Sequence, residues 1–194
     1  IGQDFIIQRV QRVIDGRILC IDVSWFGSKF RVINVYCPVE LQERVAVLRE
    51  LQPPLLCSKE VILGGDFNCL VNKKDKQTTS TVRLDSSSEI LQNIIKDFRL
   101  RDAYRSKNPI LPGYTWSNGR THSRIDFLLT SMGLQVVDAG TTPVFFSDHH
   151  KIECSVTLKD IIQKGRGSWK LNISLLQDEK VVSEFRVNST IGSP

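Results

Sequence analysis

An aspartate and an asparagine lie two residues apart in the sequence Gly-Gly-Asp-Phe-Asn, directly after the apolar run Glu-Val-Ile-Leu. On an extended segment, the side chains of Asp66 and Asn68 project to the same side. A carboxylate there could act as a base or orient a water molecule, and an amide could position a phosphate without adding charge. The same residues are also typical of a turn, and both interpretations stay open.

A second carboxylate and a histidine occur further along the chain. Asp126 lies within the apolar segment Arg-Ile-Asp-Phe-Leu-Leu, and a buried charge in such a segment needs a partner. That partner could belong to a structural ion pair, or it could be a catalytic histidine that Asp126 orients. Ser147-Asp148-His149 supplies such a histidine, because imidazole exchanges protons near neutral pH. The adjacent Asp148 is a candidate ligand for a hard cation such as Mg²⁺. We interpret His150 as a surface or strand residue.

Several further polar and aromatic residues are candidates for the same site. Tyr36 ends an apolar run just before Cys37-Pro38, so its hydroxyl could face the same edge, although an ordinary rim position explains it equally well. Thr115, Trp116 and Asn118 precede Asp126. The Trp116 ring could stack on a base or a sugar, or it could belong to the core.

Most of these residues lie at or near the end of a predicted strand, where the loops of a layered sheet protein converge on one edge. Helical spacing of apolar residues predicts one helix over 39–52, ended by Pro53-Pro54, and a second opened by a capping box from Ser86 to Glu89. Together these elements predict an α/β layered domain over residues 1–158. Alternating apolar residues between turn signals predict strands at 5–10, 17–23, 30–36, 60–64, 113–117, 124–130, 133–138 and 150–158.

The charge is mildly basic, with 26 Lys and Arg against 21 Asp and Glu in 194 residues, a formal net charge of +5. The basic residues of two segments are either solvated surface or a rim that follows phosphates. No apolar run approaches the roughly 20 residues that span a bilayer, so no membrane segment is expected. The first basic segment is a polar loop with Lys73, Lys74 and Lys76, and the second follows a predicted helix and contains Arg99, Arg101, Arg105 and Lys107.

The five cysteines are scattered and include no Cys-x-x-Cys pair. An odd count in a chain of this length argues against a disulfide framework. The three histidines do not fall at zinc-ligand spacing from any cysteine. We therefore expect small buried thiols in an intracellular, reducing compartment.

Five blocks occur in a fixed order: Asn-Val-Tyr-x-Pro, Gly-Gly-Asp-Phe-Asn, Tyr-Thr-Trp, Ser-Arg-Ile-Asp-Phe and Ser-Asp-His. In this order the chain resembles the endonuclease/exonuclease/phosphatase superfamily, and within it the endonuclease domain of LINE-type (non-LTR) retrotransposon polyproteins. The segment 165–176 is similar to the link between that endonuclease and a reverse transcriptase. The resemblance implies a four-layered α/β sandwich of the deoxyribonuclease and apurinic endonuclease type, and residues 159–194 as a tail toward a reverse transcriptase in cis.

The resemblance also implies metal-dependent hydrolysis of a phosphodiester, with Mg²⁺ or Mn²⁺ as cofactor and double-stranded DNA as the nicked substrate. Asp66 would activate the attacking water and Asn68 would contact the scissile phosphate. His149, held by Asp126, would stabilise the phosphorane-like state, and Tyr36 would support the phosphate or the nucleophile. Asp148 would be the carboxylate that faces the metal ion. The residues similar to phosphate- or substrate-contacting positions are Thr115, Trp116, Asn118 and Ser147.

One part of the family pattern has no counterpart here. In the family, an Asn and then a metal-binding Glu come from strands that precede all five blocks. The glutamates of this chain that come closest, Glu40, Glu43 and Glu50, lie on or beside the first predicted helix, so none of them replaces that Glu by position. We therefore expect an amino-terminally truncated copy that lacks the first strands of the fold, binds Mg²⁺ weakly and nicks DNA slowly.

Two other functions stay open: a catalytically incomplete remnant that at most binds nucleic acid, and a superfamily phosphatase acting on inositol or sphingolipid head groups. A DNA target would place the protein in the nucleus.

Overall fold

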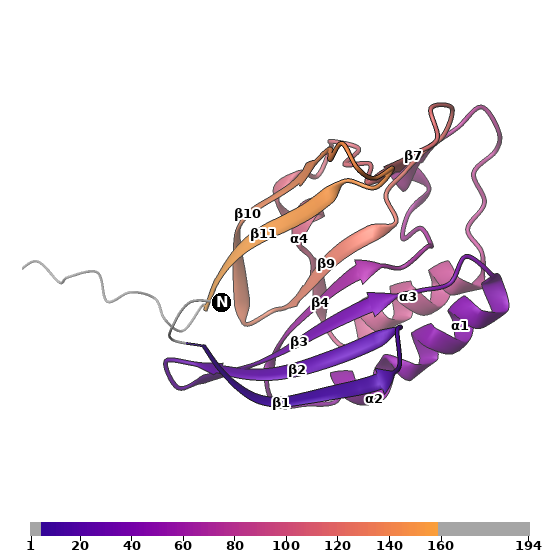
Figure 1. The fold of residues 1–194 in the computed structure, drawn as a ribbon. Coiled ribbons are helices and arrows are strands. Elements are labelled where there is room, and N and C mark those ends of the chain that lie inside the picture. Colours follow the sequence, from indigo (N-terminus) through magenta and orange to yellow (C-terminus); the bar gives the residue numbers. More distant parts are fainter. Residues whose placement is uncertain (1–4, 159–194) are drawn as a thin grey trace, which may run out of the picture. The chain divides into compact units, whose positions relative to one another are not determined.

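A six-stranded sheet is the framework of the fold in a computed structural model that describes residues 5–158 (Figure 1). The first three strands form an antiparallel meander, β3 and β4 are parallel, and β9 lies antiparallel to both β4 and β6. The predicted tail at 159–194 lies outside the described residues. In sheet order the strands are β1 (Phe5–Ile14), β2 (Ile18–Trp25), β3 (Ser28–Tyr36), β4 (Glu60–Asp66), β9 (Asp126–Ser131) and β6 (Leu100–Asp102).

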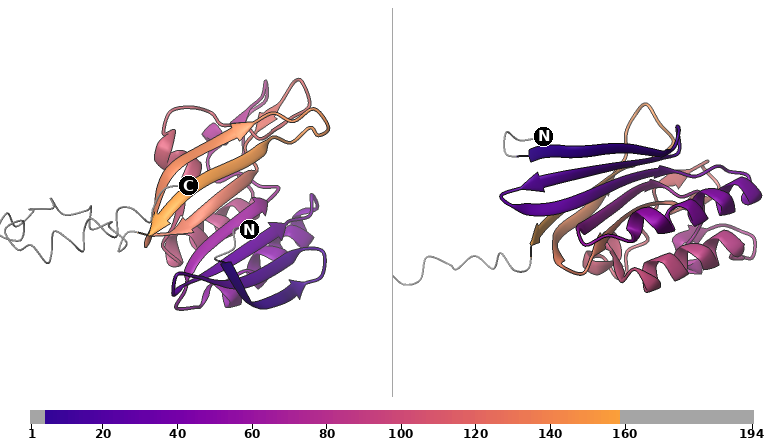
Figure 2. Two further views of the ribbon diagram at one scale, coloured as in Figure 1. Left: turned by 60° about the vertical axis from the view of Figure 1, so that its left-hand side comes forward. Right: turned by 90° about the horizontal axis from the view of Figure 1, so that it is seen from below.

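Helices cover one face of this sheet (Figure 2). They are α1 (Leu41–Glu50), α2 (Gln52–Leu55) and α3 (Ser86–Asp97). Alternate residues of each strand point to opposite faces, and one set packs with the helices in the main core. The buried apolar side chains of that set include Ile18, Cys20, Ile33, Val35, Val61, Leu63, Phe127 and Leu129, with Leu48, Leu51, Leu91 and Ile94 from the helical layer.

Two helix boundaries differ from the prediction. Pro53-Pro54 does not end the helical region but lies in the first turn of α2, where a proline's missing N–H removes no helical hydrogen bond. The second long helix is capped by Asp85 rather than by a capping box at Ser86: the Asp85 carboxylate accepts from the backbone N–H groups of Ser87 and Ser88. Aspartate and serine are equally strong N-caps, and Asp85 takes the position because it is the extended residue directly before the helix.

The opposite face of the sheet carries a two-stranded antiparallel sheet, β10 (Leu134–Thr142) and β11 (Lys151–Leu158). Val23 and Phe30 of the large sheet pack there with Leu134 and Val156. Residues 5–158 thus supply three layers of the predicted α/β sandwich: helices, large sheet and small sheet.

Short elements connect the layers near one edge. The segment predicted as a strand at 113–117 is extended only at β7 (Trp116–Ser117), which pairs with β8 (His122–Ser123); β8 pairs in turn with β5 (Lys76–Gln77). The remaining elements are the 3₁₀ turn η1 (Lys73–Asp75) and the helix α4 (Ala103–Lys107).

All five cysteines are free, and Cys20, Cys37 and Cys69 are buried. Burial raises the pKa of both Cys37 and Cys69 to about 12, so these thiols stay protonated at neutral pH. They behave as the small apolar side chains that the sequence predicted. Among the described residues, no helix is long and apolar enough to cross a membrane.

Candidate active site

The end of β4 brings Asp66 and Asn68 into direct contact. The backbone N–H of Asn68 donates to Asp66 Oδ1 at 2.9 Å, and Asn68 Nδ2 donates to Asp66 Oδ2 at 3.1 Å and to the Cys37 carbonyl at 2.8 Å. Asn68 adopts φ +48°, a conformation that asparagine tolerates better than most residues. The turn and the paired side chains, which were alternatives in the sequence, are thus one arrangement, and it fixes the orientation of the carboxylate.

Gly65 allows β4 to come this close to β3. Its φ is +140°, and a Cβ at this position would lie 1.9 Å from the carbonyl oxygen of Val35. Because that atom belongs to the backbone, it cannot move aside as a flexible side chain could. Only glycine fits here, and it places Asp66 opposite Tyr36 in the register of the two strands.

Asp126 and His149 form the partnership that the sequence predicted for the buried carboxylate. His149 Nδ1 lies 3.0 Å from Asp126 Oδ2 and 3.2 Å from Oδ1. The fully buried Thr115 holds this segment, because its Oγ1 accepts from the backbone N–H groups of Ile125 and Asp126, each at 3.1 Å. The Thr115 hydroxyl therefore supports the backbone of the Asp–His pair.

The two carboxylates lie opposite each other where β4 ends and β9 begins. Asp66 and Asp126 are directly paired residues of β4 and β9. One potential ligand atom from each of Asp66, Asp126 and His149 can be chosen so that all three lie within 4.8 Å of one another. The sequence supplied all three residues, and the register of the sheet brings them together.

Burial raises the pKa of both carboxyl groups, and the proximity of Asp126 adds to the shift at Asp66. Burial raises the pKa of Asp66 to about 6, the N–H of Asn68 opposes the rise, and the nearby Asp126 adds to it. Burial also raises the pKa of Asp126, against the opposing effects of its hydrogen bonds with Thr115 and His149. The site favours a proton, or a cation, that reduces the negative charge.

The other predicted residues surround this group. Asp148 is exposed and its Oδ2 accepts from Trp116 Nε1 at 2.7 Å, while Ser147 Oγ accepts from the backbone N–H of His149 at 3.0 Å. Trp116 also forms an isolated β-bridge with His149. Asp148 is not a member of the ligand group of Asp66, Asp126 and His149, so its metal role stays a prediction. These contacts hold the histidine-bearing segment against β7.

Two predicted residues make contacts of a different kind. Tyr36 is 47% exposed, and the guanidinium of Arg17 lies 4.9 Å from the centre of its ring. Asn118 Oδ1 accepts from the backbone N–H groups of Arg120 and Thr121 at 3.1 and 2.8 Å. That oxygen therefore stabilises the β7–β8 turn, and a role toward substrate stays a prediction for both residues.

Glutamates near the first helix do not enter the group of potential ligands. The Glu40 carboxylate caps α1 by accepting from the N–H groups of Gln42 and Glu43. Among the described residues, the group of potential ligands contains aspartate and histidine only. That none of Glu40, Glu43 and Glu50 replaces the family's glutamate stays a prediction.

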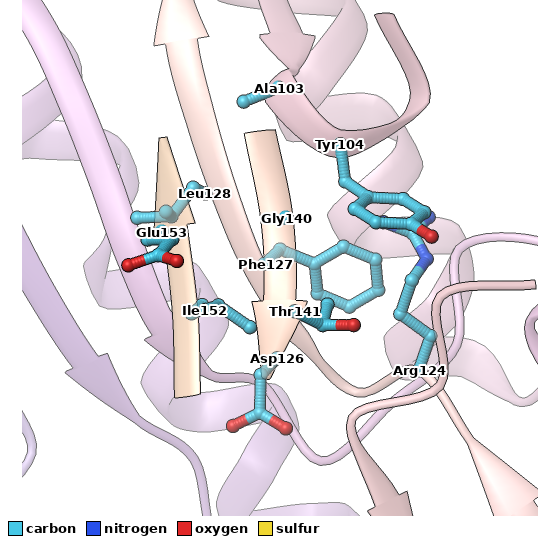
Figure 3. Close-up of a pocket in the computed structure, with 10 residues that line it drawn as sticks. All are labelled: Ala103, Tyr104, Arg124, Asp126, Phe127, Leu128, Gly140, Thr141, Ile152 and Glu153. Atoms are coloured by element: carbon cyan, nitrogen blue, oxygen red, sulfur yellow. The ribbon is translucent and has the colours of Figure 1, made fainter. Parts of the chain in front are cut away.

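A buried ion network beneath the site was not foreseen. Arg124 Nε donates to Asp75 Oδ1 at 3.0 Å, Arg124 Nη2 lies 2.7 Å from Asp102 Oδ2, and Arg105 Nη2 lies 2.6 Å from Asp75 Oδ1. Asp75 is fully buried, and the Arg124 guanidinium lies 4.5 Å from the centre of the Phe127 ring. In Figure 3 the Arg124 side chain lies beside Tyr104 and Phe127, and the Asp126 carboxylate points away from them.

This network corrects one interpretation of the basic segments. Arg105 is neither solvated surface nor a free phosphate contact, because it pairs with a buried aspartate from the lysine-rich loop. Asp75 lies between Lys74 and Lys76, which made the whole loop resemble a solvated one. One feature of the sequence could have indicated this network: Arg124 lies two residues before Asp126, at the start of an apolar segment.

Comparisons with known proteins agree with this geometry. The chain is 21% identical to a variant of the 3′ phosphatase NExo from Neisseria, solved with a product DNA hairpin, with a TM-score of 0.59 over 81% of this chain and 72% of that one. It is 17% identical to an AP endonuclease from Archaeoglobus fulgidus, with a TM-score of 0.60 over 79% and 71% of the two chains. The chain therefore shares its α/β fold with these two proteins.

Residues 30–153 match the family model described as endonuclease-reverse transcriptase. The "Transposon TX1 uncharacterized 149 kDa protein" of Xenopus laevis is 30% identical over 183 residues, which cover 90% of this chain and 14% of that protein. The chain belongs to the endonuclease-reverse transcriptase family, as a LINE-type endonuclease-like domain with a nuclease-type function. It spans about 14% of the length of its transposon relative.

Proposed function

We propose that the domain hydrolyses phosphodiesters with the help of a divalent metal ion and nicks double-stranded DNA. The observation that carries the proposal is the Asp126–His149 hydrogen bond beside the Asp66 carboxylate. A base, an oriented imidazole and paired carboxylates at one sheet edge are the groups that attack on a phosphate requires.

Each residue has a separate role in the proposed reaction. Asp66, held by Asn68, accepts the proton of the attacking water. His149 donates to a phosphate oxygen through Nε2, because its Nδ1 is engaged with Asp126. Asp126 stabilises positive charge on the imidazole as negative charge grows on the phosphate. Tyr36 contacts the phosphate from the neighbouring strand end. The amide of Asn68 donates to Asp66 and to the Cys37 carbonyl, so Asn68 acts by positioning the Asp66 carboxylate.

The donor set fits a divalent cation. Mg²⁺ takes oxygen ligands and is commonly held by one or two carboxylates together with phosphate oxygens of the substrate. Asp66 and Asp126 supply such carboxylates at directly paired positions of β4 and β9. When bound, Mg²⁺ or Mn²⁺ would act as a Lewis acid on the scissile phosphate.

The proposal includes the setting of the domain. We infer that it works in cis with a reverse transcriptase in a longer retrotransposon polyprotein, as its similarity to a transposon protein supports. DNA as the target places this activity in the nucleus.

Nicking of supercoiled plasmid tests the proposed function. With Mg²⁺ the full chain should convert supercoiled to open-circular DNA, and EDTA should stop the reaction. His149→Ala should lower the rate about 10²–10⁴-fold, the usual contribution of a positioned acid or base. His122→Ala is the matched control, since His122 stacks on Tyr114 outside the Asp–His pair. Metal-independent nicking, or equal loss in both variants, would contradict the proposal.

A further inference from the structure

Two adjacent phenylalanines at the β10–β11 connection are exposed without contributing to the core. Phe145 is 100% and Phe146 is 76% exposed, and their rings contact edge-to-face with centroids 5.1 Å apart. Both rings face water, where burial would be favourable for apolar surface. Exposed apolar side chains that gather at one place often mark an interaction site.

The base of this connection is held at the candidate active site. Ser147 accepts from the N–H of His149, Asp148 accepts from Trp116 Nε1, and Trp116 bridges to His149. The two phenylalanines precede these anchors directly in the chain. The anchors fix where the aromatic pair leaves the site.

Chain length limits how far the pair can lie from the reacting groups. Phe146 is three residues and Phe145 four residues from His149, and an extended chain covers at most about 3.5 Å per residue, so their Cα atoms lie within about 10 and 14 Å of it. Bases of one DNA strand rise about 3.4 Å per step, so this range is about three to four steps. The pair therefore lies within reach of DNA that is bound with a phosphate at His149.

Charges near the site favour DNA as the occupant. Lys73 and Lys74 are exposed just before β5, and Arg120 is exposed on the β7–β8 turn. The sheet β5-β8-β7 connects these cations to His149 through the Trp116 bridge. Cations that follow phosphates, with exposed aromatic rings beside them, are the combination with which proteins bind unstacked bases.

We propose that Phe145 and Phe146 insert between bases of DNA bound at the candidate active site, so that the site prefers DNA whose stacking is already weakened by an unpaired base. Apolar side chains that enter a base step partly unstack it, and an unpaired base lowers the cost of doing so. This inference rests on DNA as the substrate of the proposed function.

Binding without cleavage tests the inference. The full chain is titrated in EDTA against two fluorescein-labelled duplexes, one fully paired and one with a single unpaired base. The wild type should bind the second duplex about tenfold more tightly, as expected when aromatic stacking on a base is gained. Phe145→Ala/Phe146→Ala should bind both equally, with an unchanged melting temperature, because no core residue is uncovered.

Two control variants and a second signal sharpen the test. Met132→Ala removes an exposed apolar side chain that follows β9 at the opposite end of that strand from Asp126, and it should keep the preference. Phe145→Leu/Phe146→Leu should lose most of the preference, because leucine has no ring to stack on a base. A 2-aminopurine next to the unpaired base should brighten on binding the wild type and not on binding the double alanine variant.

The outcomes separate this inference from the proposed function. A preference or a 2-aminopurine signal retained by the double alanine variant, or no preference in the wild type, would overturn the role of the pair. An oligomeric wild type with a monomeric double variant of equal DNA affinity would instead assign the pair to contact between copies. If the preference depends on the pair but no plasmid is nicked with Mg²⁺, the proposed function fails and this inference stands.

Discussion

Asp66 and Asp126 lie directly opposite each other across β4 and β9, at the point where both strands meet the candidate active site. They come from motifs that are far apart in the sequence. Burial of each group is the main reason why its pKa is raised, and the proximity of Asp126 raises the pKa of Asp66 further. Two carboxylates held this close destabilise the folded state once both are ionised.

The first prediction concerns stability and pH. The pKa of Asp66 rises from 3.8 to about 6 on folding, so the folded protein binds this proton more tightly than the unfolded chain. Its stabilising contribution is present below about pH 4 and is lost as pH rises through about 6. Asp66→Asn should therefore be more stable than the wild type at pH 8, by about 2 kcal/mol.

Urea unfolding in EDTA from pH 4 to pH 8 measures this difference. The gap between Asp66→Asn and the wild type should open between pH 4 and pH 7. Asp97→Asn, at the end of α3 and away from the site, serves as the control. A gap of equal size at every pH would show that the substitution acts through packing instead.

The second prediction concerns metal binding. Mg²⁺ at pH 8 should raise the melting temperature of the wild type, because a ligand that binds only the folded state stabilises it by RT ln(1 + [L]/Kd). The stabilisation should be absent from Asp66→Asn/Asp126→Asn, which carries the site without its carboxylates. Differential scanning fluorimetry with Mg²⁺ and with Na⁺ at matched ionic strength checks this. The same rise in both proteins would place the cation elsewhere.

The third prediction concerns the backbone at Gly65. A Cβ there would collide with the Val35 carbonyl oxygen at 1.9 Å, so Gly65→Ala forces β3 and β4 apart and should cost about 3 kcal/mol or more. Gly119 has φ +83° with no atom within 4 Å of an added Cβ. Gly119→Ala should cost only the conformational strain of about 1–2 kcal/mol. Equal losses in urea unfolding would contradict the close approach of the two strands.

The fourth prediction concerns the ion network below the site. Arg124→Met leaves the fully buried Asp75 with Arg105 as its remaining cation and removes the partner of Asp102. Breaking a buried ion pair from one side typically costs about 3–5 kcal/mol, and we expect a loss in this range. Arg120→Met, at an exposed position, is the control and should change the unfolding free energy by less than about 0.5 kcal/mol.

The sequence by itself located most of the long strands, the two long helices and most of the candidate residues. Alternating apolar residues located β2, β3, β9 and β11, because the apolar side chains of each strand are on the whole less exposed than the polar ones between them. The apolar surroundings of Asp126 showed that it needs a partner, and His149 is that partner. Local pattern and chemical type were sufficient for these conclusions.

Only the tertiary structure decided which residues meet. The pairing of Asp66 with Tyr36 on one side and Asp126 on the other depends on the register between strands that are distant in sequence. Asp75 lies in a polar, lysine-rich loop, and nothing local predicts its complete burial. Its partners, Arg105 and Arg124, come from other segments, and the burial of a charge is favourable only where such partners converge.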